Sequence, residues 1–112
     1  MRILILDDNP ALLQVLALSL RSAGFTVTTF SSPHEVLKNI HEADVLVTDY
    51  HMPEMTGLEV ARRAYAQGWR GSLFLMSGRS SAITEPMEHP LLHSLLDKPF
   101  PASELVEKLR LL

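Results

Sequence analysis

The fold of this chain can be predicted outward from one stretch, which reads Met1-Arg2-Ile3-Leu4-Ile5-Leu6-Asp7-Asp8-Asn9-Pro10. Four consecutive apolar residues favour a strand covered on both faces, because a half-exposed strand would alternate with polar residues. Two acids follow, then an asparagine and a proline suited to the cap and first position of a helix. We expect this helix to end near Gly24 and to bury four leucines: Leu12, Leu13, Leu16 and Leu20.

Similar apolar runs recur along the chain, separated by segments with helix start signals. The runs cover residues 45–47, 73–76 and 95–96, while residues 25–30 alternate apolar side chains with threonine, as a less buried edge strand does. Strands joined by helical crossovers predict a flavodoxin-like α/β fold. It is a doubly wound, five-stranded parallel sheet in the order 2-1-3-4-5, with helices on both faces.

Two segments have the spacing of a capping box, in which a Ser or Thr precedes a Glu by three residues. They are Ser32-Pro33-His34-Glu35 and Thr56-Gly57-Leu58-Glu59. The first predicts a helix through Ile40, and the second predicts a helix through about Gln67 that Gly68 ends.

The region before the last apolar run is broken by Pro86 and Pro90, which cannot both lie inside one helix, so any fourth helix is expected to be short or distorted. A last helix is predicted from about Pro101, with Glu104 and Lys108 paired on its exposed side. Its expected buried residues are Leu105, Val106, Leu109 and Leu112.

Composition limits the class of protein. The 112 residues are 46% apolar, enough for the core of one domain, 1–112, and leave no room for a second. The chain contains no cysteine and no membrane-length apolar segment, so we expect a cytoplasmic protein without a membrane contact. A net charge of −3 without a basic stripe argues against direct nucleic-acid binding.

Five reactive side chains follow the predicted strands at one edge of the sheet, where ligands of doubly wound folds bind. They are Asp7, Asp8, Asp49, Ser77 and Lys98. Close carboxylates repel each other by roughly 4 kcal/mol per pair at an effective dielectric constant near 20, so the cluster favours a hard cation such as Mg²⁺. A carboxylate nucleophile with an ammonium and a hydroxyl beside it is also suited to phosphoryl transfer.

The same residues carry a resemblance to a known family. The Asp7-Asp8 pair, the run Asp49-Tyr50-His51-Met52-Pro53-Glu54-Met55-Thr56-Gly57, Ser77-Gly78 and Lys98-Pro99-Phe100 resemble the CheY-like receiver domains of two-component response regulators. The D-x-x-M-P-x-M-x-G run is fairly specific by itself, whereas the other pieces gain weight from their order and spacing. The resemblance covers essentially the whole chain.

The resemblance implies a Mg²⁺-dependent phosphoacceptor site. Asp49 would accept the phosphoryl group and, with Asp8 and the backbone carbonyl of His51, bind the metal, which Asp7 would help to position through water. Ser77 would hydrogen-bond a phosphoryl oxygen and Lys98 would pair with its charge. Gly78 would leave room for the incoming group, and the Lys98-Pro99 bond is expected to be cis.

Three features depart from the family pattern. Receivers usually carry an aromatic switch residue three positions before the lysine, where this chain has Leu95. His93 is expected on the same face of the strand, so either Leu95 or His93 would take the switch position. The proline-broken segment 82–90 falls where similar receivers have a helix that, with the last strand and last helix, can form a dimer surface. His51 and Arg79 match positions that tune dephosphorylation, from which we hypothesise slow autodephosphorylation.

The leading hypothesis is a phosphorylation switch. A histidine kinase or histidine phosphotransfer protein would supply the phosphoryl group, the chain would catalyse its own phosphorylation and slow dephosphorylation, and a downstream effector protein would bind the altered state. The alternative is a pseudo-receiver that acts as a phosphorylation-independent interaction module. A phosphatase would need an acid where His51 stands, and a nucleotide- or flavin-binding domain would need a phosphate-cradling loop in place of Asp7-Asp8-Asn9-Pro10.

Overall fold

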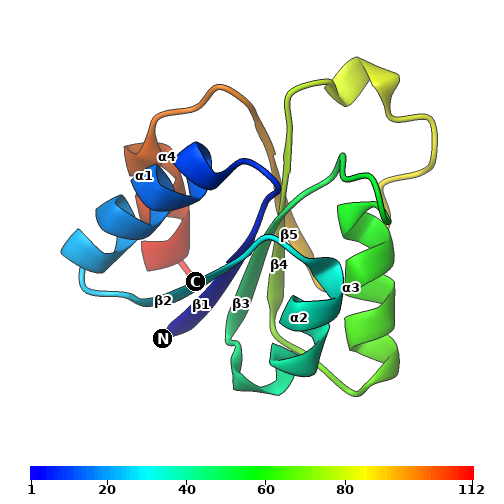
Figure 1. Ribbon diagram of the computed structural model, residues 1–112, viewed down its shortest axis with the longest axis horizontal. Coiled ribbons are helices and arrows are strands. Elements are labelled where there is room, and N and C mark those ends of the chain that lie inside the picture. The colour runs from blue at the N-terminus through cyan, green and yellow to red at the C-terminus, as the bar shows by residue number, and fades with distance from the viewer.

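The first apolar run forms a central strand of the sheet. In the computed structural model, which describes all 112 residues, β1 (Arg2–Leu6) lies between β2 (Thr26–Phe30) and β3 (Val45–Asp49), followed by β4 (Ser72–Ser77) and β5 (Leu92–Asp97). All neighbours pair in parallel, in the predicted order β2-β1-β3-β4-β5 (Figure 1). Every residue of β3 is buried, as its unbroken apolar run predicts.

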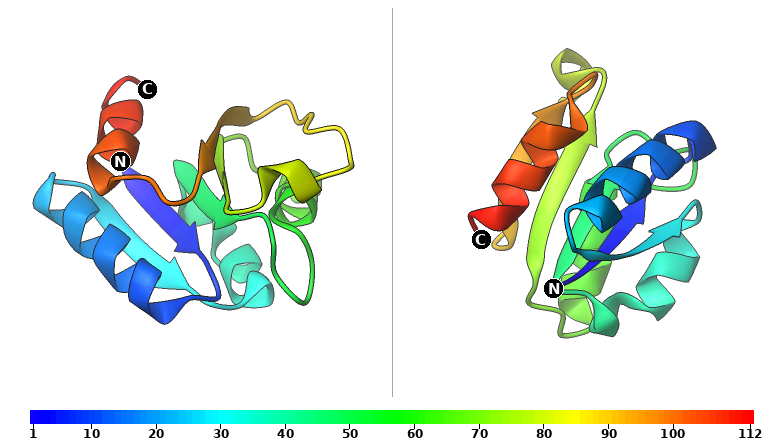
Figure 2. Two further views of the ribbon diagram at one scale, coloured as in Figure 1. Left: turned by 90° about the horizontal axis from the view of Figure 1, so that it is seen from above. Right: turned by 90° about the vertical axis from the view of Figure 1, so that its left-hand side faces the viewer.

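Helices cover both faces of the sheet. Figure 2 shows α1 (Pro10–Ser22) and α4 (Ala102–Arg110) on one face, while α2 (Pro33–Lys38) and α3 (Gly57–Ala66) lie on the other. Alternate strand residues point to opposite faces, so there are two apolar clusters, one on each face. No helix combines the length and the apolar character needed to cross a membrane.

The start of α1 follows the sequence signals. The Asn9 side chain accepts hydrogen bonds from the backbone N–H groups of Ala11 at 3.0 Å and Leu12 at 3.3 Å. The helix ends at Ser22, two residues before Gly24, whose φ of 98° is readily adopted only by glycine. The Asn9 cap fixes the end of the short loop between β1 and α1, which positions the two acids within that loop.

Several local expectations were wrong. Ser32 makes no side-chain cap hydrogen bond, and the α-helix it precedes ends at Lys38, after which Ile40–Glu42 continue as a 3₁₀ turn (η1). Glu104 and Lys108 do not form an ion pair, and Leu112 is 44% exposed because α4 ends two residues before it. By contrast, the Thr56 hydroxyl accepts the Glu59 N–H at 3.1 Å, so the second predicted cap is confirmed.

The crossover from β4 to β5 contains no α-helix. A single 3₁₀ turn, η2 (Ser80–Ala82), is followed by an irregular segment that returns beside α3, in yellow in Figure 1. Pro86 and Pro90 explain this shape, since each lacks an N–H donor and disfavours helical backbone in the residue before it. The expected short or distorted fourth helix is thus reduced to three residues.

Candidate functional site

Three carboxylates meet where β1 and β3 end. Asp7 and Asp8 directly follow β1, and Asp49 is the last residue of β3. One carboxylate oxygen from each lies within 4.8 Å of the others. Asp7 is fully buried and Asp49 is 5% exposed, whereas Asp8 faces solvent. The predicted convergence of the acids is therefore confirmed, because parallel strands deliver their ends to one edge.

Lys98 joins the two buried acids. Its Nζ lies 2.7 Å from Asp7 Oδ2 and 3.2 Å from Asp49 Oδ1. The other oxygen of Asp7 accepts the backbone N–H of Asn9 at 2.9 Å, so the Asp7 carboxylate is held from two sides. The Lys98-Pro99 bond that follows is cis, as expected. Lys98 thus places one positive charge between two carboxylates.

The pKa values of this cluster reflect burial and charge. Burial raises the pKa of Asp49 above its usual range, the charge of Asp7 raises it further, and Lys98 opposes both. For Lys98, burial is the largest single influence and lowers the pKa. The hydrogen bond to Asp7 and the charges of Asp7 and Asp49 together outweigh it, so the pKa of Lys98 is raised. The pocket therefore favours added positive charge.

Ser77 occupies the neighbouring corner of the site. It ends β4, is 1% exposed, and its hydroxyl oxygen accepts the backbone N–H of Arg79 at 3.0 Å. The same hydroxyl is hydrogen-bonded to Nε2 of His51 at 2.9 Å. The His51 side chain is therefore turned toward Ser77.

Gly57 allows α3 to approach the end of β3. A Cβ atom at this position would lie 2.3 Å from the backbone oxygen of Asp49 and 3.1 Å from a methyl carbon of Leu75. The Gly57 N–H donates to the carbonyl of Tyr50 at 2.9 Å, which ties the first turn of the helix to the strand. The glycine of the D-x-x-M-P-x-M-x-G run is thus required by close backbone contact.

An open pocket of about 400 Å³ lies on the solvent side of the acid cluster, at Asp8. Its lining residues are Asp8, His51, Met52, Pro53, Thr56 and Arg79. The acid cluster supplies oxygen ligands of the type that hard divalent cations prefer. Beside the Asp49 carboxylate, Ser77 adds a hydroxyl and Lys98 adds an ammonium. These are the elements of a phosphoryl-transfer site.

Comparison with known proteins agrees with this geometry. The family model described as the response regulator receiver domain matches residues 3–110. The chain belongs to the response-regulator receiver family. Phosphorylation signalling is the general role of this family, and the resemblance seen in the sequence motifs is thereby confirmed.

Curated relatives of this receiver are response regulators. The response regulator receiver protein CpdR of Brucella abortus is 31% identical over 96% of this chain and 92% of its own length. The response regulator protein TodT of Pseudomonas putida is 32% identical over 96% of this chain. This chain spans about half, 49%, of the length of TodT.

Solved receiver structures share the fold. The response regulator protein TrrA of Thermotoga maritima, crystallised in complex with Mg²⁺ and BeF, superposes with a TM-score of 0.83 at 27% identity. The superposition covers 97% of this chain and 96% of that one. The five-stranded CheY-like architecture is therefore shown by comparison as well as by the strand order.

The receiver's switch position is taken by Leu95, and His93 does not share its face. The pairing of β4 with β5 shifts register at His93, as in a β-bulge. Leu95 is 37% exposed and pairs with Leu75 on the α3 side, whereas the His93 ring stacks at 4.8 Å on Phe74, which belongs to the opposite cluster. The expectation of a common face was wrong because the bulge interrupts the two-residue period.

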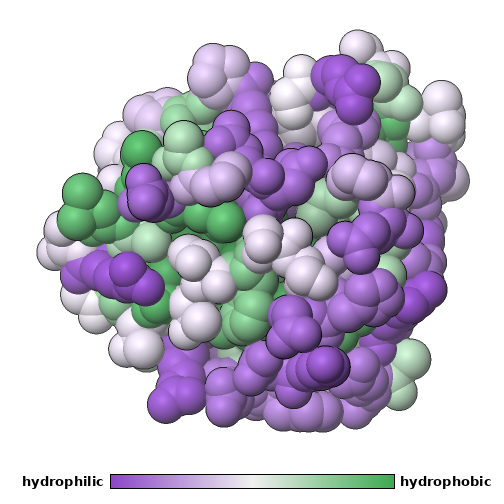
Figure 3. Space-filling view, viewed as in Figure 1, coloured by the Kyte–Doolittle hydropathy of each residue, from purple (hydrophilic) through white to green (hydrophobic).

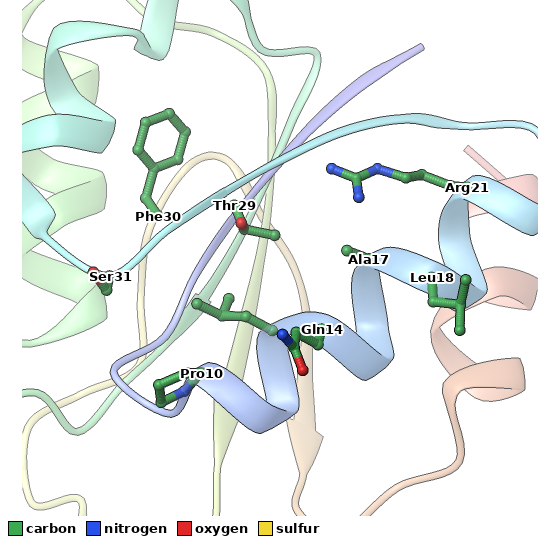
Figure 4. Close-up of a pocket in the computed structure, with 9 residues that line it drawn as sticks. Pro10, Gln14, Ala17, Leu18, Arg21, Thr29, Phe30 and Ser31 are labelled. Atoms are coloured by element: carbon green, nitrogen blue, oxygen red, sulfur yellow. The ribbon is translucent and has the colours of Figure 1, made fainter.

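A second hollow on this receiver has no carboxylate among its lining residues. A groove of about 540 Å³ runs between α1 and β2, with Leu18 and Thr29 along it and the Phe30 ring turned away from α1 (Figure 4). Figure 3 shows apolar atoms gathered over the same side, where Val15 and Leu18 are 58% and 69% exposed. The Arg21 guanidinium there donates to the carbonyl of Val27 at 2.9 Å. This groove lacks the groups that phosphoryl chemistry requires.

Sequence reasoning missed one polar cluster. The Tyr50 hydroxyl donates to Glu85, and Glu85 also accepts from Arg62 at 2.7 Å. Burial first, and then the hydrogen bond to Glu85, raise the pKa of Tyr50 to about 12. No spacing rule links Tyr50 to Glu85, because they come from different loops that only the tertiary structure brings together.

Proposed function

We propose that this chain is a phosphorylation-dependent switch of a two-component phosphorelay, and that Asp49 is its phosphoacceptor. The observation that carries the proposal is the cluster of three carboxylates at the end of the parallel sheet, two of which, Asp7 and Asp49, pair with Lys98. The phosphodonor would be a histidine kinase or a histidine phosphotransfer protein, and a downstream effector protein would bind the phosphorylated form.

The donor set fits Mg²⁺. Asp7, Asp8 and Asp49 offer carboxylate oxygens, which hard cations prefer over nitrogen ligands, and the backbone carbonyl of His51 would add another oxygen. The exposure of Asp8 leaves this side of the cluster open to solvent. When bound, the cation would neutralise charge on the phosphoryl oxygens. Asp7 would position the metal through water, as in similar receivers.

The transfer step follows from the chemistry of the side chains. A carboxylate oxygen of Asp49 attacks phosphorus, an O–P bond forms, and the N–P bond of the donor phosphohistidine breaks. The donor imidazole keeps the bonding electron pair and takes up a proton. Lys98 pairs with the negative phosphoryl oxygens, and the Ser77 hydroxyl donates to one of them. The product is an acyl phosphate on Asp49.

A direct chemical test uses acetyl phosphate as donor. The whole chain is incubated with Mg²⁺ and acetyl phosphate, and its intact mass is measured. A phosphate-sized gain that disappears in Asp49→Asn supports the proposal. The matched control is Asp44→Asn, since Asp44 is an exposed acid just before the opposite end of β3. No gain in the unaltered chain, or an equal gain in Asp49→Asn, contradicts it.

The second candidate is a pseudo-receiver that binds a partner regardless of phosphorylation. The observations that favour it are Leu95 in place of the aromatic switch and the missing helix between β4 and β5. Absence of a mass gain, together with unchanged partner binding in Asp49→Asn, would support this candidate. The intact acid cluster favours the phosphorylation switch.

Two further properties remain hypotheses. His51 and Arg79 line the pocket of about 400 Å³ beside the acids, and their bulk would shield an acyl phosphate from water, so we expect slow autodephosphorylation. A half-life of seconds in the mass assay would contradict this. A homodimer through the segment before β5, β5 itself and α4 would appear as a mass doubling by light scattering after phosphorylation.

A further inference from the structure

The segment between η2 and β5 is extended and packs side chains in alternation. Its inward residues are half-buried and its outward residues are exposed. The inward set is Ile83, Glu85, Met87 and His89, and the outward set is Thr84, Pro86, Glu88 and Pro90. Ile83 and Met87 pack against the apolar cluster on the α3 side. We call residues 83–89 the strap.

Glu85 fastens the strap at its centre. One carboxylate oxygen accepts from the Tyr50 hydroxyl and the other accepts from Nη2 of Arg62 on α3 at 2.7 Å. Tyr50 is only 6% exposed and belongs to the apolar cluster, so its hydroxyl is a fixed anchor. At the far end of the strap, the His89 ring lies edge-on to Tyr65 at 5.4 Å. We call the two hydrogen bonds that the Glu85 carboxylate accepts, from Tyr50 and Arg62, the latch.

Contacts run from the latch to the phosphoacceptor pocket by two routes. In the first, the Tyr50 ring lies edge-on to the His51 ring at 4.8 Å, and His51 is hydrogen-bonded to the Ser77 hydroxyl. In the second, Ser77 accepts the backbone N–H of Arg79, the residue that precedes η2 and leads into the strap. One serine thus contacts both His51, which packs on the Tyr50 ring, and Arg79, which precedes η2.

We propose that the strap, latched by Glu85 onto Tyr50 and Arg62, is the element that changes conformation when Asp49 is phosphorylated. The inference rests on the proposed function. In this chain, the strap would give the conformational response to phosphorylation that a crossover helix and an aromatic switch residue would otherwise give.

The physical reason is competition for the Ser77 hydroxyl. In the tautomer that leaves His51 Nε2 without a proton, the Ser77 hydroxyl donates its one proton to this nitrogen, and a phosphoryl oxygen on Asp49 would compete for that proton. His51, freed from Ser77, no longer fixes the neighbouring Tyr50 ring, and the shift of Ser77 moves the backbone that enters the strap. Phosphorylation then favours the unlatched state of a two-state segment.

The first arm of the test weakens the latch without phosphorylation. Tyr50→Phe keeps the buried ring but removes the hydroxyl, and Glu85→Gln removes the charge from the latch. We expect cleavage within residues 83–90 by a broad-specificity protease to accelerate about tenfold in each variant, an effect of the size of one hydrogen bond to a charged group. Glu88→Gln, an outward acid of the same strap, is the matched control and leaves the rate unchanged.

Cleavage sites are mapped by mass spectrometry, with cleavage in α1 as an internal reference for global unfolding. Equal acceleration of cleavage in the strap and in α1 in Tyr50→Phe would overturn the proposed role of the latch. Equal acceleration of strap cleavage in Glu88→Gln and Tyr50→Phe would overturn it too. Selective acceleration in the strap supports it.

The second arm adds Mg²⁺ with beryllium fluoride, a phosphoryl stand-in, and in parallel acetyl phosphate. We expect strap cleavage in the unaltered chain to rise toward the rate of Tyr50→Phe, and we expect Tyr50→Phe to show no further rise. A phosphate-sized mass gain without faster strap cleavage overturns the strap inference and leaves the proposed function intact. The absence of any mass gain overturns the proposed function, and with it the role of the strap.

Discussion

Replacing Asp49 with asparagine is expected to stabilise the metal-free protein. The substitution keeps the size of the side chain and removes a negative charge from a site that is 5% exposed. Ionised Asp49 faces Asp7 and Asp8 within 4.8 Å, and Lys98 Nζ lies 3.2 Å from its Oδ1. Burial disfavours the ionised form, the acids repel it, and the lysine attracts it.

The distances allow the balance to be worked out. At an effective dielectric constant of about 20, repulsion by Asp7 costs roughly 3.5 kcal/mol, and attraction to Lys98 contributes about 5 kcal/mol in the opposite sense. Asp8 is exposed and adds a smaller repulsion that solvent screens. Repulsion and attraction nearly cancel, so the cost of burying the ionised carboxylate decides whether Asp49→Asn stabilises or destabilises the fold. We expect Asp49→Asn to gain about 1 kcal/mol, or roughly 4 °C in melting temperature.

The assay is thermal unfolding of the unaltered chain and Asp49→Asn at pH 7.5 in a chelator, with Glu88→Gln as a control for the loss of one exposed negative charge. Mg²⁺ should reverse the order of the two melting temperatures, so that the unaltered chain melts higher than Asp49→Asn. At about 100 times its dissociation constant it stabilises the unaltered chain by roughly 2.7 kcal/mol and Asp49→Asn by less. A melting temperature of Asp49→Asn at or below that of the unaltered chain without metal would refute the reasoning.

The same substitution has a defined pH dependence. Burial, and then Asp7, raise the folded-state pKa of Asp49 above its unfolded value. A carboxyl with a raised folded pKa destabilises the fold only where it is ionised. The cost is absent below the unfolded pKa of about 3.9 and is complete above the folded pKa. The advantage of Asp49→Asn should therefore grow as the pH rises from 4, and melting curves across this range measure it.

Three other outcomes are expected. In urea titrations, Gly57→Ala should lower the free energy of unfolding by about 2 kcal/mol or more, because its Cβ would lie 2.3 Å from a backbone oxygen. Gly78→Ala is the matched control and should cost less than about 0.5 kcal/mol, because its Cβ would lie 3.8 Å from the nearest atom. The Tyr50 phenol should ionise near pH 12, and Glu85→Gln should lower that pKa, as read from ultraviolet absorbance. Trp69→Phe should cost about 1–3 kcal/mol, because it leaves a buried carbonyl without the 2.9 Å indole hydrogen bond.

Much of the fold could be predicted because its signals are local. The unbroken apolar runs mark buried parallel strands, and the Asn9-Pro10 cap marks the start of α1. The two prolines correctly predicted a defective crossover helix. The gathering of Asp7, Asp49 and Lys98 followed from the fold class, since parallel strands bring their ends to one edge.

Other features depended on contacts between distant residues. The sequence alone could not predict the bulge that separates His93 from Leu95, because register depends on how β5 meets β4. Likewise, Ser32 matches a capping box but makes no cap hydrogen bond.

Periodicity and caps by themselves therefore determined which residues form strands and helices and which edge of the sheet carries the acids, because both depend on backbone preferences over a few residues. Only the tertiary structure decided that Lys98 bridges two acids, that His51 turns to Ser77, and that Glu85 fastens a strap to Tyr50. Those contacts join segments far apart in the chain, and their geometry exists only after the sheet and helices have packed.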